Sequence, residues 1–126
     1  MDMYIDHINI STPRELLNEV KDFYCNVLGL KNGFRPNFSR FGYWLYAGDK
    51  ALIHLIESDS HFANEKQGYL DHFAFRATGL ASILQRLDSH QIEYRTSFIA
   101  EKNLTQVFFK DPAGIGVEIG FVAETA

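Results

Sequence analysis

The chain contains very little cysteine, no excess of basic residues and no long apolar run. Cys25 is the only cysteine in 126 residues, so no disulfide can form within the chain, which is typical of a reducing compartment. No apolar stretch approaches the roughly 18–20 residues that a membrane-spanning helix needs. The first residues, Met1 to Tyr4, have neither the basic nor the apolar region of a signal peptide. We therefore expect a cytoplasmic protein with no membrane interaction.

Positive charge is also scarce. Lys and Arg number 12 against 16 Asp and Glu, which gives a formal net charge of −4. Because nucleic-acid binding needs a basic surface, we expect no nucleic-acid partner. Gly114 and Gly116 precede an expected strand instead of opening a helix, so they are not a dinucleotide-binding motif. No phosphate loop or Gly-x-Ser-x-Gly sequence occurs either. The partner we expect is a small-molecule substrate.

What the chain does contain is many aromatic residues and an internal repeat. Its 11 Phe and 6 Tyr favour β-rich structure and a cavity lined by aromatic rings. Tyr4-Ile5-Asp6-His7 returns as Tyr69-Leu70-Asp71-His72, 65 positions later. A repeat of half the chain length indicates two copies of one structural unit. We expect a single domain, residues 1–126, with pseudo-repeat units of about 3–58 and 68–122.

The first half predicts a strand, a helix and three further strands. Residues 5–10 alternate apolar and polar side chains, as in a strand. Ser11-Thr12-Pro13 is typical of a helix start with a capping residue. The helical spacing of apolar residues then continues to Gly29, a plausible C-cap. The three further strands are expected at residues 34–38, 41–47 and 51–57.

The second half repeats this order after a polar linker, residues 58–68. A strand is expected over residues 69–76, with His72, Ala74 and Arg76 on one face, and a helical stripe runs from Leu80 to Leu87. The last strands are expected at residues 93–100, 104–109 and 116–121. The sequence thus predicts an α+β protein made of two tandem βαβββ units.

Four polar side chains occupy equivalent places among apolar neighbours in the two units. His7 and His72 belong to the first strand of each unit, and His54 and Glu118 are centred in the last strands, 64 positions apart. A lone histidine in a strand is more often a packed or surface residue than a ligand. Two units related by a pseudo-twofold axis would, however, bring all four groups towards one centre. The sequence therefore predicts a site for a divalent metal, of which Zn, Ni, Fe and Mn suit imidazole and carboxylate ligands.

The coordination number stays open at this point. His7, His72 and Glu118 alone would form the two-histidine, one-carboxylate triad of non-haem Fe(II) oxygenases. With His54 the set has three histidines and one glutamate, which closes a tetrahedral site and leaves two positions of an octahedral one. His54 is therefore a ligand, a proton shuttle or part of the cavity wall.

Other polar and aromatic residues are weaker candidates for the site. Packing or surface roles remain the simpler interpretation for five residues that could line the cavity, namely Asn9, Tyr43, Trp44, Tyr46 and Arg76. We expect His61 in the linker and His90 in a turn to face solvent, and Cys25 to pack within the first helix.

Several motifs resemble those of the vicinal-oxygen-chelate superfamily, which includes glyoxalase I, extradiol dioxygenases, fosfomycin-resistance thiol transferases and bleomycin-binding proteins. The resemblance covers nearly the whole chain. It is carried by Asp6-His7-Ile8-Asn9-Ile10, Phe23-Tyr24-Cys25-Asn26-Val27-Leu28-Gly29, Leu70-Asp71-His72-Phe73-Ala74-Phe75 and Asp111-Pro112-Ala113-Gly114 before Val117-Glu118-Ile119. It implies paired βαβββ units that form an incomplete β-barrel around a metal and ligand cavity, with His7, His72 and Glu118 as metal ligands.

The same resemblance implies a function and an assembly. His54 stands where the isomerases often have Glu or Gln, and Ser11 where glutathione-dependent members have Arg, so a glutathione substrate is not expected. The chemistry implied is of the glyoxalase type, a metal-dependent lyase or isomerase acting on a small molecule with two neighbouring oxygens, with Glu118 or His54 as catalytic base. The alternatives are an extradiol-type Fe(II) dioxygenase and a metal-free module that binds an aromatic or drug-like ligand. A homodimer is also implied, because superfamily members often exchange units between subunits.

Overall fold

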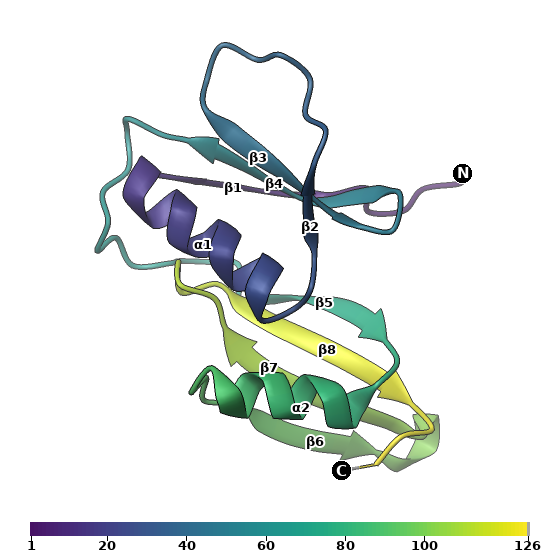
Figure 1. Ribbon diagram of the computed structural model, residues 1–126. Helices are drawn as coiled ribbons and strands as arrows, with labels where there is room; N and C mark the ends of the chain where they lie inside the picture. The colour runs from purple at the N-terminus through teal and green to yellow at the C-terminus, as the bar shows by residue number, and fades with distance from the viewer. Residues whose placement is uncertain (126) are drawn as a thin grey trace. The chain divides into compact units, whose positions relative to one another are not determined.

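The protein is described by a computed structural model that covers residues 1–125. The chain divides into two compact units, Met1–Glu65 and the part from Lys66 onward, which are described separately. Both units are visible in the ribbon of Figure 1. No helix within residues 1–125 is long and apolar enough to cross a membrane.

The first unit, called unit 1, is a four-stranded sheet with one helix. Its elements are β1 (Ile8–Thr12), α1 (Arg14–Asn26), β2 (Lys31–Gly33), β3 (Gly42–Ala47) and β4 (Lys50–Glu57). The strand order is β1-β4-β3-β2. β1 lies parallel to β4, whereas β3 is antiparallel to both β4 and β2. The crossover through α1 allows β1 and β4 to run in the same direction, and α1 lies along one face of the sheet (Figure 1).

The core of unit 1 lies between this sheet face and α1. Strand alternation turns Ile10, Leu45, Ile53 and Leu55 towards the helix, where each is at most 4% exposed. The helical stripe supplies the matching buried residues Leu17, Val20, Phe23 and Tyr24. Burying each of these large apolar side chains contributes roughly 1.5–3 kcal/mol to folding. The face turned away from α1 carries the polar residues of interest.

The two ends of α1 differ in how their backbone groups are satisfied. The expected side-chain cap at its start is wrong, because Pro13 is the N-cap and no side chain bonds to the first turn. Thr12 is instead the buried last residue of β1, and its hydroxyl donates to the Pro13 carbonyl at 2.9 Å. At the other end, Gly29 has φ +80°, and its amide donates to the Cys25 carbonyl. The C-cap is Val27 and not Gly29 as expected, and Gly29 supplies the left-handed residue that follows the end of the helix.

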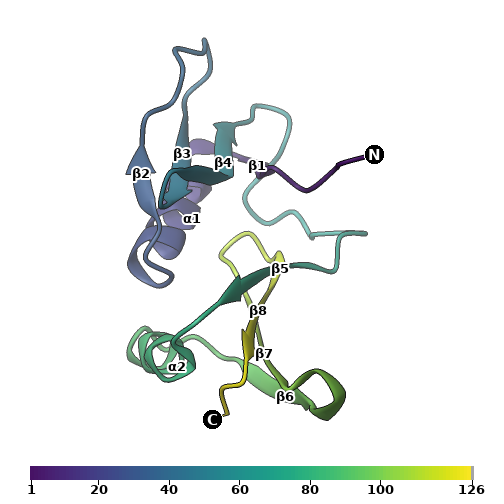
Figure 2. The same cartoon turned by 90° about the vertical axis from the view of Figure 1, so that its right-hand side faces the viewer.

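The second unit, called unit 2, repeats the plan of unit 1. Its elements are β5 (His72–Ala77), α2 (Leu80–Ser89), β6 (Arg95–Ile99), a 3₁₀ turn at Ala100–Lys102, β7 (Leu104–Lys110) and β8 (Gly116–Val122). The strand order β5-β8-β7-β6 matches that of unit 1, with β5 parallel to β8. Figure 2 shows α2 on one side of this sheet. The buried residues between them include Leu80, Leu87, Val107, Ile119 and Phe121.

The expected α+β class and the two tandem βαβββ units are confirmed, with corrections to three strands. β1 begins at Ile8 and β5 at His72, so residues 5–7 and 69–71 are not strand. The strand expected at residues 34–38 is wrong, and the second neighbour of β3 is the short strand Lys31–Gly33. Each sheet is open at its edges and not closed into a barrel. The single-domain interpretation and the repeat bounds stay predictions.

Candidate functional site

Each sheet has one face packed against its helix and a second face, called here the open face. Alternation places every second residue of a strand on the open face. In unit 1 the open face includes His7, Asn9, Trp44, Tyr46 and His54. In unit 2 it includes His72, Ala74, Gln106, Phe108 and Glu118. All four predicted metal ligands thus lie on open faces, one pair in each unit.

Three rings are stacked across the open face of unit 1. The ring centroids of His7 and His54 are 3.7 Å apart with an interplanar angle of 10°. The other side of His54 faces Trp44, with centroids 4.0 Å apart at 12°. Burial of His54, and next the charge of His7, lower the pKa of His54 below its ordinary value. The stack therefore holds His54 flat between two rings and favours its neutral form, in which a ring nitrogen can accept a proton or bind a metal.

His7 is oriented by its sequence neighbour. The Nδ1 of His7 lies 2.7 Å from Oδ2 of Asp6. This hydrogen bond lowers the pKa of the Asp6 carboxyl. When Nδ1–H is bonded to a carboxylate, the free electron pair lies on Nε2. Histidine ligands of metals are commonly held in this way.

Unit 2 has the same Asp–His contact. The Nδ1 of His72 lies 2.8 Å from Oδ2 of Asp71. The Nε2 of His72 lies 3.1 Å from Oε1 of Glu118. The hydrogen bond that His72 donates to Asp71 is the main cause that raises the pKa of His72, and Glu118 adds to it. An imidazole nitrogen and a carboxylate oxygen are therefore side by side on the open face of β5 and β8.

Glu118 is held from a second side. Gln106 of β7 donates from Nε2 to Oε2 of Glu118 at 3.0 Å. The Glu118 side chain is only 12% exposed, whereas that of His72 is 39% exposed. Both carboxylate oxygens thus have a partner, as a buried carboxylate requires.

The two pairs occupy equivalent register positions. Asn9 is the Cα partner of His54 in unit 1, and Ala74 is that of Glu118 in unit 2. The histidine lies two residues before this partner in both units. In unit 2 the approach of Asp71 and His72 to β8 depends on Gly116, because a Cβ there would lie 2.2 Å from the Asp71 carbonyl oxygen. The repeat seen in the sequence is therefore a repeat of side-chain placement.

One expectation about individual residues needs correction, and one residue that could have lined the cavity has the packing role that was the simpler interpretation. His7 precedes β1 and His72 opens β5, so neither lies in the middle of a strand. Tyr43 does not lie on the open face, because its hydroxyl donates to Oδ1 of Asn18 in α1 at 2.6 Å. Its alternation with Trp44 decides this, since neighbouring residues of a strand point to opposite faces.

The open faces carry cavities next to both pairs. In unit 1 a cavity of about 400 Å³ is lined by Trp44, Tyr46 and His54 and by the segment Tyr4–Asp6. In unit 2 a larger cavity of about 760 Å³ borders His72, Phe108 and Arg95. The Arg95 guanidinium lies over the Phe108 ring at 4.1 Å from its centroid. Cavities of this size accommodate small molecules.

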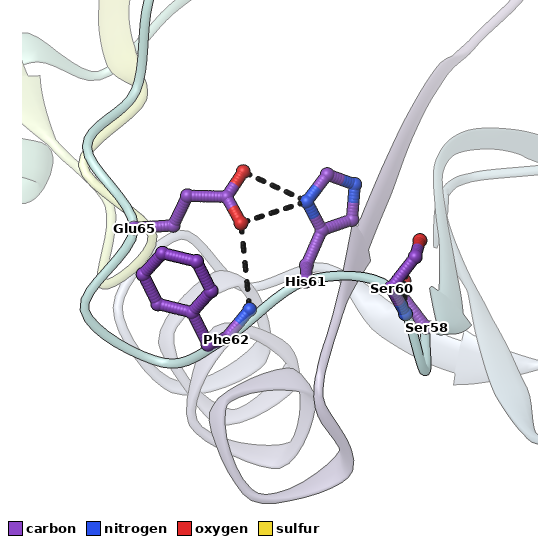
Figure 3. Close-up of polar contacts among 5 residues, drawn as sticks. All are labelled: Ser58, Ser60, His61, Phe62 and Glu65. Atoms are coloured by element: carbon purple, nitrogen blue, oxygen red, sulfur yellow. Dashed lines mark hydrogen bonds and ion pairs between the residues drawn. The ribbon is translucent and has the colours of Figure 1, made fainter.

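The remaining histidines and the cysteine take no part in either pair. The Nδ1 of His61 contacts both carboxylate oxygens of Glu65, at 2.8 and 3.0 Å (Figure 3). His90 is exposed at the end of α2. Cys25 is half-buried, and burial raises the pKa of its thiol. The solvent-facing interpretation of the two histidines agrees with these positions.

The fit of a metal can be tested on the donors themselves. Within residues 1–125, no group of three or more His, Cys, Asp or Glu side chains is arranged to hold a metal ion. Each unit by itself presents two donors, His7 with His54 and His72 with Glu118. Their imidazole and carboxylate chemistry suits Zn, Ni, Fe or Mn. The donor types fit a divalent metal, and each pair alone is half of a usual ligand set.

Sequence reasoning missed Asp6, Asp71 and Gln106 as parts of the site. The two aspartates were visible as the repeated Asp-His dipeptide, but a sequence does not show that the carboxylate turns back to the next ring. Gln106 lies 12 positions before Glu118 and reaches it only through the β7–β8 pairing.

The family follows from a comparison of sequences. The sequence model of the Glyoxalase/Bleomycin resistance protein/Dioxygenase superfamily matches residues 4–119. The chain belongs to this superfamily. The match spans both βαβββ units and includes all four candidate ligands. No curated protein sequence matches this member of the glyoxalase superfamily.

Solved structures of the glyoxalase superfamily share the fold. A glyoxalase family protein from Bacillus anthracis is 22% identical, with 97% of each chain covered and a TM-score of 0.77. Lactoylglutathione lyase from Agrobacterium tumefaciens is 20% identical, with 95% of this chain and 94% of that chain covered and a TM-score of 0.67. A variant of the fosfomycin resistance protein FosX from Listeria monocytogenes is 16% identical, with 97% and 94% covered and a TM-score of 0.71. That FosX structure contains Mn(II) and 1S,2S-dihydroxypropylphosphonic acid.

Proposed function

We propose that this protein is a metal-dependent enzyme that acts on a small molecule with two neighbouring oxygens, by lyase or isomerase chemistry of the glyoxalase type. The observation that carries the proposal is the pair in unit 2, where His72 Nε2 lies 3.1 Å from Glu118 Oε1 and Asp71 holds the other ring nitrogen. A carboxylate that orients a histidine through Nδ1 is the usual arrangement behind a metal ligand. Unit 1 repeats it with Asp6 and His7.

The proposed metal ligands are His7, His54, His72 and Glu118. The ion would be divalent Zn, Ni, Fe or Mn, and the Mn(II) in the FosX structure supports a metal of this kind. We infer that each pair contributes two of these ligands and that the protein forms a homodimer. When bound, the ion would act as a Lewis acid that stabilises negative charge on a substrate oxygen.

The chain's own residues would move the proton. If His54 does not bind the metal, it is the first candidate base, because its lowered pKa keeps the imidazole neutral and able to accept a carbon-bound proton. The rings of His7 and Trp44 stack on the two sides of His54 and fix the plane of its imidazole. Glu118 is the second candidate, with Gln106 as its positioning residue. The aromatic rings on the open faces would exclude water from the reacting atoms.

Two alternatives have support from particular observations. The set His7, His72 and Glu118 has the composition of the triad used by non-haem Fe(II) dioxygenases. The flat stack of Trp44, His54 and His7 would also suit a metal-free module that binds an aromatic ligand. The nature of the bound metal separates these functions.

The first experiment is elemental analysis by mass spectrometry of protein purified without chelators, followed by titration of the metal-free protein with Zn, Ni, Fe(II) and Mn. We expect Zn, Ni or Mn to bind with high affinity. We expect His72→Ala to weaken binding about 100-fold or more, because a ligand is lost. His90→Ala is the matched control, since this histidine is exposed and outside both pairs, and its metal affinity should equal that of the wild type.

Each other outcome has a clear meaning. Iron as the metal retained on purification would favour the dioxygenase. If the protein binds none of the four metals, the metal-free binding module is the function that remains. If His72→Ala lowers the free energy of unfolding but not metal affinity, the histidine packs and does not bind the metal.

A further inference from the structure

Unit 1 contains a second cavity that is rich in arginine. Its volume is about 680 Å³, and it lies among the start of α1, the segment before β3 and the end of β4. Three arginines and two carboxylates line it, namely Arg14, Arg35, Arg40, Glu57 and Asp59. The cavity thus has one surplus positive charge in a chain whose formal net charge is −4.

The carboxylates of this cavity are already paired. Arg14 donates to both oxygens of Glu57, at 2.9 and 3.2 Å. Arg40 donates to Oδ1 of Asp59 at 2.9 Å. Arg35 has no carboxylate partner among residues 1–125, and its Nε is buried without a hydrogen-bond partner. A guanidinium that is partly withdrawn from water and has no acceptor is costly, so the surplus charge of the cavity resides on Arg35.

Arg35 is held in place without using its hydrogen-bond donors. Its guanidinium lies over the Phe38 ring, 4.8 Å from the centroid. It also lies against Gly42, where a Cβ would come within 2.9 Å of Nη2. Because a glycine occupies this position of β3, the guanidinium lies close to the strand backbone. The planar donor group is fixed in position for an acceptor that the described part of the chain does not supply.

The position of Arg35 connects it to the histidine pair of unit 1. Gly42 and Trp44 lie on the same face of β3, opposite Ile56 and His54 of β4. Two residues along a strand span about 7 Å. The Phe38 ring under Arg35 has its centroid 6.1 Å from that of Trp44, which in turn stacks on His54. Arg35 is also among the charges that lower the pKa of His54, after burial and His7.

We propose that Arg35 binds a small oxyanion, a carboxylate or a phosphate-type group, in the arginine-rich cavity of unit 1. This inference rests on the proposed function: the anion is the charged end of the substrate. The reacting oxygens of the substrate then lie beside His54, about 7 Å from the charged end. The substrate class is then a small organic acid. A planar fork matches a carboxylate or a phosphate in a two-point hydrogen bond, which a lysine could not make.

Trp44 makes the proposal measurable without any activity. It is the only tryptophan of the chain, and it lies between Phe38 and His54. Metal-free protein is titrated with inorganic phosphate and, separately, with acetate, and tryptophan fluorescence is recorded at constant ionic strength. We expect saturable binding in the millimolar range, as two or three charge-assisted hydrogen bonds provide. The anion that binds more tightly identifies the type of acidic group.

Three variants give the test its specificity. Arg35→Met should weaken binding at least about tenfold, and Arg35→Lys by less, since it keeps the charge but loses the fork. Arg86→Met is the matched control, because it removes the same charge from an exposed arginine of α2 that lines none of the cavities described above. Its anion affinity should equal that of the wild type. Circular dichroism checks the fold of each variant, and Arg35→Lys carries the test if Arg35→Met does not fold.

Two outcomes would overturn the role of Arg35. One is the absence of saturable binding of either anion up to roughly 50 mM, which corresponds to negligible affinity. The other is equal binding by the wild type and Arg35→Met. A zinc titration of the same samples separates this inference from the proposed function. Zinc binding without anion binding refutes only the oxyanion role of Arg35. Anion binding without any metal binding refutes the proposed metal-dependent enzyme and supports the oxyanion site.

Discussion

Units 1 and 2 have the same strand order and register but place different chemistry at equivalent positions. The equivalent pairs, each 64 positions apart, are Gly42 and Gln106, Trp44 and Phe108, and His54 and Glu118. In unit 2, Gln106 donates to Glu118. In unit 1 a glycine takes the place of this glutamine, and the Arg35 guanidinium lies there instead. One backbone plan therefore presents an aromatic and cationic face in unit 1 and a carboxylate and amide face in unit 2.

The difference extends to proton affinity. Burial between rings lowers the pKa of His54, whereas Asp71 and Glu118 raise the pKa of His72. What both units keep is the Asp–His contact, at 2.7 Å in unit 1 and 2.8 Å in unit 2. The position of a side chain is therefore set by the sheet. The protonation of a histidine at that position is set by the neighbouring rings and carboxylates. The lowered pKa leaves His54 neutral and able to accept a proton, whereas the raised pKa of His72 means that a metal ion would have to displace a proton in order to bind there.

The largest expected effect concerns Gly116, which has no counterpart in unit 1, where Leu52 stands 64 positions earlier. A Cβ at position 116 would lie 2.2 Å from the Asp71 carbonyl oxygen and 2.9 Å from Cβ of His72. Gly116→Ala must therefore move the start of β5 away from β8. We expect a loss of about 3 kcal/mol in the free energy of unfolding, at the upper end for overpacking. Urea unfolding followed by circular dichroism measures it.

Gly68→Ala is the control for this substitution. Gly68 is also in unit 2 and has no positive φ, and a Cβ at this position would meet no atom within 4 Å. Its replacement should change stability by less than about 1 kcal/mol and in the stabilising direction, because alanine restricts the unfolded chain. Equal effects of the two substitutions would show that the close approach of Asp71 to β8 is not a constraint.

Much of the fold could be predicted from local patterns. The strands expected at residues 41–47, 51–57, 104–109 and 116–121 correspond to β3, β4, β7 and β8, and the 64-residue offset correctly gave both units the same order. The edge strand β2 of unit 1 was missed because Lys31–Gly33 is short, wholly exposed and without alternation, and Gly33 lies under the Tyr46 ring. Its pairing with β3 depends on backbone hydrogen bonds, which leave no trace in side-chain polarity.

The site could be predicted only as far as the repeat extended. The repeat identified His7, His54, His72 and Glu118 as equivalent positions of the two units. It could not show that His54 is stacked between two rings, because the β3–β4 register shifts at Leu45 and Tyr46. Nor could it find Arg35, whose position depends on the irregular segment after β2. Cross-strand neighbours follow from register, and register is a property of the whole sheet.

The next largest expected effect concerns metal binding by variants of Asp6 and Asp71, the two aspartates that orient histidines. On the proposed function, Asp71→Asn and Asp6→Asn each weaken metal binding about tenfold, the lower end for such partners, because both side chains are well exposed. The amide cannot accept the Nδ1–H as strongly as a carboxylate and does not fix the ring. Isothermal titration with zinc measures the affinity. Asp88→Asn, on α2 and outside both pairs, should leave it unchanged.

These two variants also test whether the units contribute equally. A loss confined to Asp71→Asn would show that unit 2 alone holds the ion, with His54 and His7 serving the substrate. A change below about twofold in both would mean that the exposed aspartates do not hold the rings in solution.

The smallest effect concerns the starts of the two helices. In unit 2 the Glu124 carboxylate accepts from the Gly79 amide at 3.1 Å and from the Leu80 amide at 2.8 Å, so it caps α2 from a distant part of the chain. α1 has no such side-chain cap. Glu124→Ala should lower the free energy of unfolding by about 1 kcal/mol, because two amides of the first turn lose their acceptor and the helix dipole loses a negative charge.

Glu124→Gln separates the two contributions to this cap, since it keeps an oxygen acceptor and loses only the charge. We expect it to cost about half as much as Glu124→Ala, and less as salt is added, because salt screens the charge. Glu15→Gln in the first turn of α1 is the matched control; Glu15 makes no capping bond, so the change should stay within about 0.5 kcal/mol. Urea unfolding at low and high salt measures all three variants. If Glu124→Ala is no worse than Glu15→Gln, the two helices start alike and the carboxylate does not cap α2 in solution.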